Sequence, residues 1–119
     1  MLSYGVMRAP WWFLFLFLIP AGVLADAVTV ADDLWSRPRE SRTVAHLPGL
    51  SLLIAAFERQ PHGLFVIRHG SGEEPQLRAE EFRAWLVSFG LPSARVLLER
   101  DPAAGGQLRL EVRTGGSRP

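Results

Sequence analysis

The stretch LFVIRHG, residues 64–70, decides how the chain folds. Its apolar residues occupy both alternations of an extended strand, with Leu64 and Val66 toward one face and Phe65 and Ile67 toward the other. A strand that is apolar on both faces is typical of a sheet interior that is covered on both sides. We therefore predict a central strand here, with Arg68 and His69 as polar residues where it emerges into solvent.

Helical and strand patterns follow one another on either side of this strand. Upstream, residues 48–61 (PGLSLLIAAFERQP) place apolar side chains on one helix face, at Leu50, Leu53, Ile54 and Phe57. Downstream, GSGEEP at 70–75 predicts a loop, and a second helix is predicted over 76–89 with an apolar stripe of Phe82, Trp85, Leu86 and Phe89. Residues 94–100 and 107–113 flank the connection DPAAGG, which predicts a terminal hairpin.

The order of these elements predicts the fold class. Val28 and Val30 alternate in a short predicted strand, and a polar surface excursion anchored by Trp35 follows it. Strand, helix, strand, helix, strand, strand then predicts an α/β fold of the two-layer α+β kind, a mixed sheet with both helices on one face. We divide the chain into the strand and excursion at 28–46, the α/β domain at 47–113 and a disordered tail at 114–119.

Residues 1–27 have the order of a secretory signal peptide. Arg8 precedes an apolar run from Trp11 to Leu24, and small residues at Ala25 and Ala27 form an A-x-A cleavage pattern. Cleavage after Ala25 is the alternative. Because the run is shorter than the ~20 residues that a membrane span needs, we predict a periplasmic or secreted protein with no stable membrane span after cleavage. An uncleaved anchor in the inner membrane is the other possibility.

Composition excludes several classes of function. The 119 residues contain no cysteine, which excludes disulfides, thiol chemistry and zinc-thiolate sites. The 13 basic residues, all arginine, are mixed with 12 acidic ones, so that no basic stripe predicts a nucleic-acid partner. No glycine-rich phosphate loop is present, since two acids follow GSG at 70–72, and we expect no cofactor.

Arg-His-Gly at 68–70 has the same letters with which histidine phosphatases begin their chemistry. Such an enzyme needs a second histidine and further phosphate ligands after the motif, but His46 and His62 both precede it. His62 and His69 would lie ~23 Å apart on an extended strand, so they cannot share a metal ion. We therefore predict no catalytic residue and no metal site, and keep a reduced phosphatase that uses His69 as a rival hypothesis.

A longer likeness begins at Arg78. The stretch RAEEFRAWLVSFGLPSARV resembles the second helix and following turn of the OmpA-like, peptidoglycan-associated domain family, R-A-x-x-V-x-x-Y-L-x-x-x-G-[VI]-x-x-x-R. Residues in the same register are Arg78, Ala79, Phe82, Trp85, Leu86, Gly90, Leu91 and Arg95. LSLLIAAFERQPHGLFVIRHG is similar to the family's first helix and G-H-T-D strand, and RLEV at 109–112 resembles its closing R-V-E-I strand. The likeness covers about residues 47–113.

The resemblance implies a ligand and a site. In that family, the arginine and an aspartate after the strand grip diaminopimelate in the peptidoglycan stem peptide, and Arg78 matches the arginine. The aspartate is missing here, the loop is shorter, and only Glu73 or Glu74 is at hand to replace it. We expect a non-enzymatic envelope module for binding or scaffolding that contacts peptidoglycan through Arg78. The alternative is an adaptor that lost the ligand and contacts another envelope protein through LWSRPRE, residues 34–40.

Overall fold

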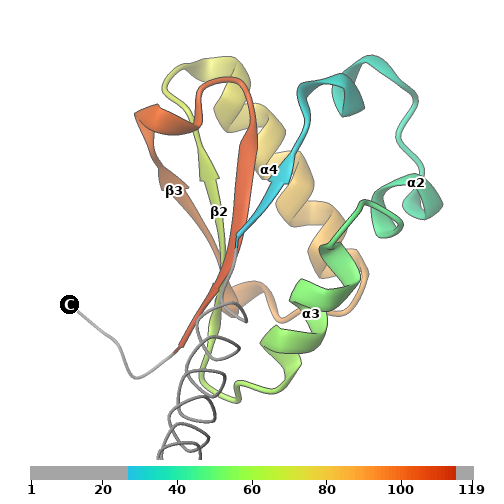
Figure 1. The fold of residues 1–119 in the computed structure, drawn as a ribbon, viewed down its shortest axis with the longest axis vertical. Helices are drawn as coiled ribbons and strands as arrows, with labels where there is room; N and C mark the ends of the chain where they lie inside the picture. The colour runs from blue at the N-terminus through green and yellow to red at the C-terminus, as the bar shows by residue number, and fades with distance from the viewer. Residues whose placement is uncertain (1–26, 115–119) are drawn as a thin grey trace, which may run out of the picture.

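Residues 27–114 are described by a computed structural model, whose helices and strands are drawn in Figure 1. One sheet contains the strands β1 (Val28–Val30), β2 (Leu64–His69), β3 (Val96–Arg100) and β4 (Leu108–Arg113). Their order is β1-β4-β2-β3, in which β2 pairs parallel with β3 and antiparallel with β4, and β4 pairs antiparallel with β1. The predicted mixed sheet is therefore confirmed.

Two main helices cover one face of this sheet (Figure 1). α3 (Leu50–Glu58) packs against β4, and α4 (Glu73–Ser88) packs against β2 and β3. The predicted apolar faces are the ones that are buried, because Leu50, Leu53 and Phe57 of α3 and Phe82 and Leu86 of α4 belong to the core. Shorter helices are η1 (Asp32–Ser36), α2 (Ser41–Ala45), η2 (Ser93–Arg95) and η3 (Pro102–Ala104).

The two faces of β2 are covered by different means. Phe65 and Ile67 are fully buried under the helices as part of the main core. Val66 points to the other face and is also fully buried, although it is not part of that core cluster. Val66 lies between Leu97 of β3 and Glu111 of β4, and ion pairs of Arg68 and Arg113 with Glu99 and Glu111 lie on the same face of the sheet.

The predicted terminal hairpin is wrong. β3 and β4 are not neighbours, because β2 lies between them and pairs with both. The crossover through α4 places β3 parallel to β2 at the outer edge, and the connection after β3 must then cross the end of β2. It does so in contact with the strand: the Asp101 amide donates to the His69 carbonyl oxygen at 2.7 Å.

The second helix begins earlier than predicted. α4 starts at Glu73, so Glu73, Glu74 and Pro75 form its first turn instead of ending a loop. Proline is accepted there because the first amides of a helix have no partner within the helix, and its ring already has a helical φ. The two acids also suit the positive end of the helix dipole.

The segment 28–46, which the sequence sets apart as a strand and excursion, shares the core of the sheet and helices. Val30, Leu34 and Val44 are at most 2% exposed and lie in the same cluster as Phe82 and Leu110. In Figure 1 this segment rises from β1 and passes to one side of α4 before it reaches α3.

Almost all of the predicted signal peptide, 1–26, lies outside the described residues, as do residues 115–119 of the predicted tail. Within residues 27–114, no helix combines the length and the hydrophobicity that crossing a bilayer requires.

Candidate functional site

Arg78 is held by two carboxylates of the chain itself. It lies in the second turn of α4, where one terminal nitrogen donates to Glu74 at 2.8 Å and the other pairs with Asp32 of η1. Its side chain is 23% exposed, while those of Asp32 and Glu74 are 63% and 74% exposed. Glu73, also named with the predicted site, is exposed and makes no ion pair with Arg78. The structure thus joins Arg78 to Glu74 and adds Asp32.

Two guanidinium groups lie close to the ring of Trp35. The guanidinium carbon of Arg39 lies 5.1 Å from its ring centroid, and that of Arg78 lies 5.7 Å away. These distances suit cation–π attraction, and the contact with Arg78 joins the excursion to α4. The indole Nε1 of Trp35 is buried, and among the described residues it has no hydrogen-bond partner.

A second ion pair joins the excursion to α4 one turn further along. Arg39 pairs with Glu81, which also accepts a hydrogen bond from Trp85 Nε1 at 3.1 Å. Burial would raise the pKa of Glu81, but the hydrogen bonds from Arg39 and Trp85 and the charge of Arg39 outweigh it and lower that pKa. Glu81 is therefore a stable carboxylate that anchors the excursion.

His69 does not emerge into solvent, so that prediction is wrong. It is 6% exposed, because its side chain shares the helix-covered face with Phe65 and Ile67. Its Nδ1 donates to the Gly70 carbonyl oxygen at 3.0 Å. Arg68 points to the opposite face, where it pairs with Glu99, Asp101 and Glu111. The two residues of the Arg-His-Gly motif therefore cannot share a bound phosphate.

Arg95, the last residue of the family-like register, fastens the turn between α3 and β2. Its Nε donates to the Gly63 carbonyl oxygen at 2.9 Å and a terminal nitrogen donates to that of Gln60 at 2.6 Å. The guanidinium carbon lies 4.2 Å from the ring centroid of Phe57. These contacts assign Arg95 to the fold, since they tie it to the backbone and the aromatic ring of the segment that leads into β2.

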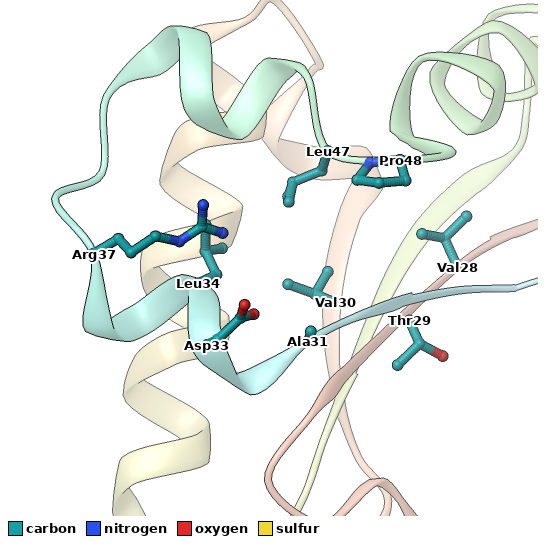
Figure 2. A pocket seen from close by; sticks show the side chains of 9 residues that line it. All are labelled: Val28, Thr29, Val30, Ala31, Asp33, Leu34, Arg37, Leu47 and Pro48. Carbon is teal, nitrogen blue, oxygen red and sulfur yellow. The ribbon is translucent and has the colours of Figure 1, made fainter.

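A hollow lies beside β1 (Figure 2). It has a volume of about 260 Å³ and is lined by Val28, Thr29, Val30, Ala31, Asp33, Leu34, Arg37, Leu47 and Pro48. Val28 and Val30 point from β1 toward Leu47 and Pro48, which belong to the segment before α3 (Figure 2). The excursion supplies the remaining wall, so the hollow lies between β1 and residues 33–48.

Sequence reasoning missed this hollow and the role of Asp32. Asp32 and Arg78 are 46 residues apart, and no local pattern marks them as partners. The apolar residues Leu34 and Leu47, in a mostly polar segment, were the available sign that the excursion turns inward. No three acidic or histidine side chains within residues 27–114 are grouped as a metal ion would require.

No family model, curated protein or solved structure matches the chain.

Proposed function

We propose that this chain is an exported, non-enzymatic protein of the cell envelope that binds another envelope protein as an adaptor. Export rests on the order of residues 1–27, a basic start, an apolar run and small residues at the A-x-A pattern. The binding role rests on one observation: residues 31–48 and β1 enclose an apolar hollow at the edge of the sheet.

The pairing of Arg78 supports a protein partner over peptidoglycan. Both terminal nitrogens of Arg78 are engaged by carboxylates of the chain, Asp32 and Glu74. A ligand carboxylate that used the planar fork would have to displace one of them, and would gain little because one ion pair replaces another. The contacts of Arg78 instead fasten the excursion, the segment that forms the hollow.

Peptidoglycan is the second candidate, for a specific reason. Asp32 lies beside Arg78 with its side chain 63% exposed, and it supplies an acid of the kind that the resembling family has and that the end of β2 lacks here. A stem peptide carries both ammonium and carboxylate groups, which Asp32 and Arg78 would receive if the present pair opened.

An enzymatic role of His69 has less support. Its ring is buried and its Nδ1 is committed to a backbone carbonyl oxygen, whereas a nucleophile must reach substrate. We expect hydrolysis of p-nitrophenyl phosphate to be no faster with the wild type than with His69→Ala. A rate that falls in the variant while its circular dichroism stays unchanged would instead favour the phosphatase.

Two captures distinguish the partners. The wild type, Asp32→Asn and Arg42→Gln are each expressed in cells and cross-linked in the envelope fraction. In a separate experiment, each of the three proteins is incubated with purified sacculi. Arg42 is an exposed α2 arginine and serves as the matched control. The adaptor predicts a cross-linked protein that all three retain and no binding to sacculi. Binding to sacculi that Asp32→Asn alone loses would replace the adaptor with the peptidoglycan ligand, and recovery of the chain from the cytosol would contradict both.

A further inference from the structure

We propose that the hollow beside β1 binds an extended peptide of the partner that carries an apolar residue and, two residues away on the same face, an acidic one. The peptide adds to the free edge of β1 as a further strand, its apolar side chain fills the hollow, and its carboxylate pairs with Arg37. This inference rests on the proposed adaptor function and specifies the chemistry of the partner.

The free edge of β1 selects an extended peptide. β1 is the first strand in the order β1-β4-β2-β3, and within residues 27–114 it pairs with β4 alone. Its outer edge therefore presents backbone amide and carbonyl groups without a neighbouring strand, which another chain can pair with. Strand addition of this kind takes its affinity from main-chain hydrogen bonds and its specificity from pockets for alternate side chains.

The hollow provides such a pocket at the same edge. Val28 and Val30 form one side of it, and Leu34, Leu47 and Pro48 form the other (Figure 2). A volume of about 260 Å³ admits a large aliphatic side chain. Because successive side chains of a strand point to opposite faces, every second residue of an added peptide would face the hollow.

Arg37 gives the peptide its charge. Its side chain lines the hollow and is exposed, and in the described part of the chain its guanidinium makes no ion pair or hydrogen bond, unlike those of its neighbours Arg39 and Arg78. A free guanidinium beside an apolar pocket is complementary to a carboxylate. Asp33 also lines the hollow and repels an acid beside it, which places the acidic residue of the peptide on the Arg37 side.

Charge reversal tests this pairing. Two fluorescein-labelled, end-blocked octapeptides alternate threonine and valine and differ only at one central valine, replaced by glutamate or by lysine, so that the charge shares a face with the remaining valines. We expect the purified protein to bind the glutamate peptide more tightly in fluorescence anisotropy. Arg37→Glu should weaken that binding by roughly tenfold and make the lysine peptide the better ligand, since attraction becomes repulsion. The control Arg42→Glu, on an exposed arginine outside the hollow, should leave both affinities within about twofold.

Amide chemical shifts locate the bound peptide. The glutamate peptide should shift residues 28–31 and 47–49 and leave the middle of α4 unchanged. The inference is overturned if neither peptide binds, if the shifts fall elsewhere, if Arg37→Glu and Arg42→Glu behave alike, or if a concentration-dependent dimer of the chain produces the same shifts without peptide.

Competition separates this inference from the function on which it rests. The glutamate peptide should release the cross-linkable partner from the wild type. If the partner remains bound in saturating peptide, the adaptor function is retained but the peptide groove is rejected as its binding site. If no envelope protein is cross-linked but the peptide still binds at β1, the adaptor function is rejected and the peptide groove is retained.

Discussion

Gly70 stands at the point where the connection from β3 to β4 crosses the end of β2. A Cβ atom built on Gly70 would overlap the carbonyl oxygen of Gly105, which lies in that connection. Because the obstacle is backbone, no side-chain rotation relieves it. The glycine in the Arg-His-Gly motif is therefore explained by close packing, without reference to phosphate chemistry.

We predict that Gly70→Ala lowers the free energy of unfolding by about 2 kcal/mol or more, since the connection has to shift to admit the methyl group. Urea denaturation followed by circular dichroism measures the change. The adjacent exposed Ser71, changed to alanine, is the control and should stay within about 0.5 kcal/mol of the wild type. Equal stability of the two variants would show that the connection does not contact Gly70 in solution.

Among the elements, the sheet surface opposite the helices is held by ion pairs. Arg113 contacts Glu99 at 2.9 Å and Glu111 at 2.7 Å, and Arg68 contacts the same two acids. Hydrogen bonds from Arg113 are the main cause that lowers the pKa of Glu99, with smaller help from Arg68 and against partial burial. The same contacts raise the pKa of Arg113, which stays charged throughout.

The lowered pKa of Glu99 makes the contribution of this surface to stability depend on pH. Because Glu99 titrates lower in the folded chain than its ordinary value of 4.5, its contribution is complete above that pH and is lost as the pH falls through the folded pKa. Glu99→Gln should therefore flatten the fall in stability as the pH drops below about 5. We expect only ~0.5–1 kcal/mol of difference, since the side chain is 42% exposed. Urea midpoints at a series of pH values measure it. Exposed Glu58, changed to glutamine, is the control, and parallel curves for all three proteins would contradict the prediction.

The positions of helices and strands were more predictable from the sequence than the pairing of the strands. The spacing at Leu50, Leu53 and Phe57 predicted α3 because one buried helix face leaves that mark. Alternation in residues 108–113 predicted a strand, but it reports which face is buried and not which strand lies alongside, so β4 was assigned to β3 instead of β2. The start of α4 at Glu73 was not predicted, because its first turn is charged and has no apolar pattern. The candidate site was harder still, since Asp32 meets Arg78 only through the tertiary fold.

At the scale of the whole molecule, the excursion and the sheet share one core. Val44 of α2 is fully buried in the cluster that contains Phe82 of α4 and Leu110 of β4. The contacts of Arg39 with Glu81 and of Arg78 with Asp32 join the same segment to α4 from outside the core. We therefore expect the hollow beside β1 to open only with loss of core contacts.

Val44→Ala tests whether the excursion folds with the rest. We expect the variant to lose about 1–3 kcal/mol of unfolding free energy, as a core substitution that leaves a cavity does, while the transition stays single and its urea dependence is unchanged. Circular dichroism and hydrogen exchange at β2 should report the same loss. If residues 31–48 were an independent flap, the change would stay within about 0.5 kcal/mol and β2 would keep its protection. Arg42→Ala on the exposed side of the same helix controls for helix propensity, and it should match the wild type.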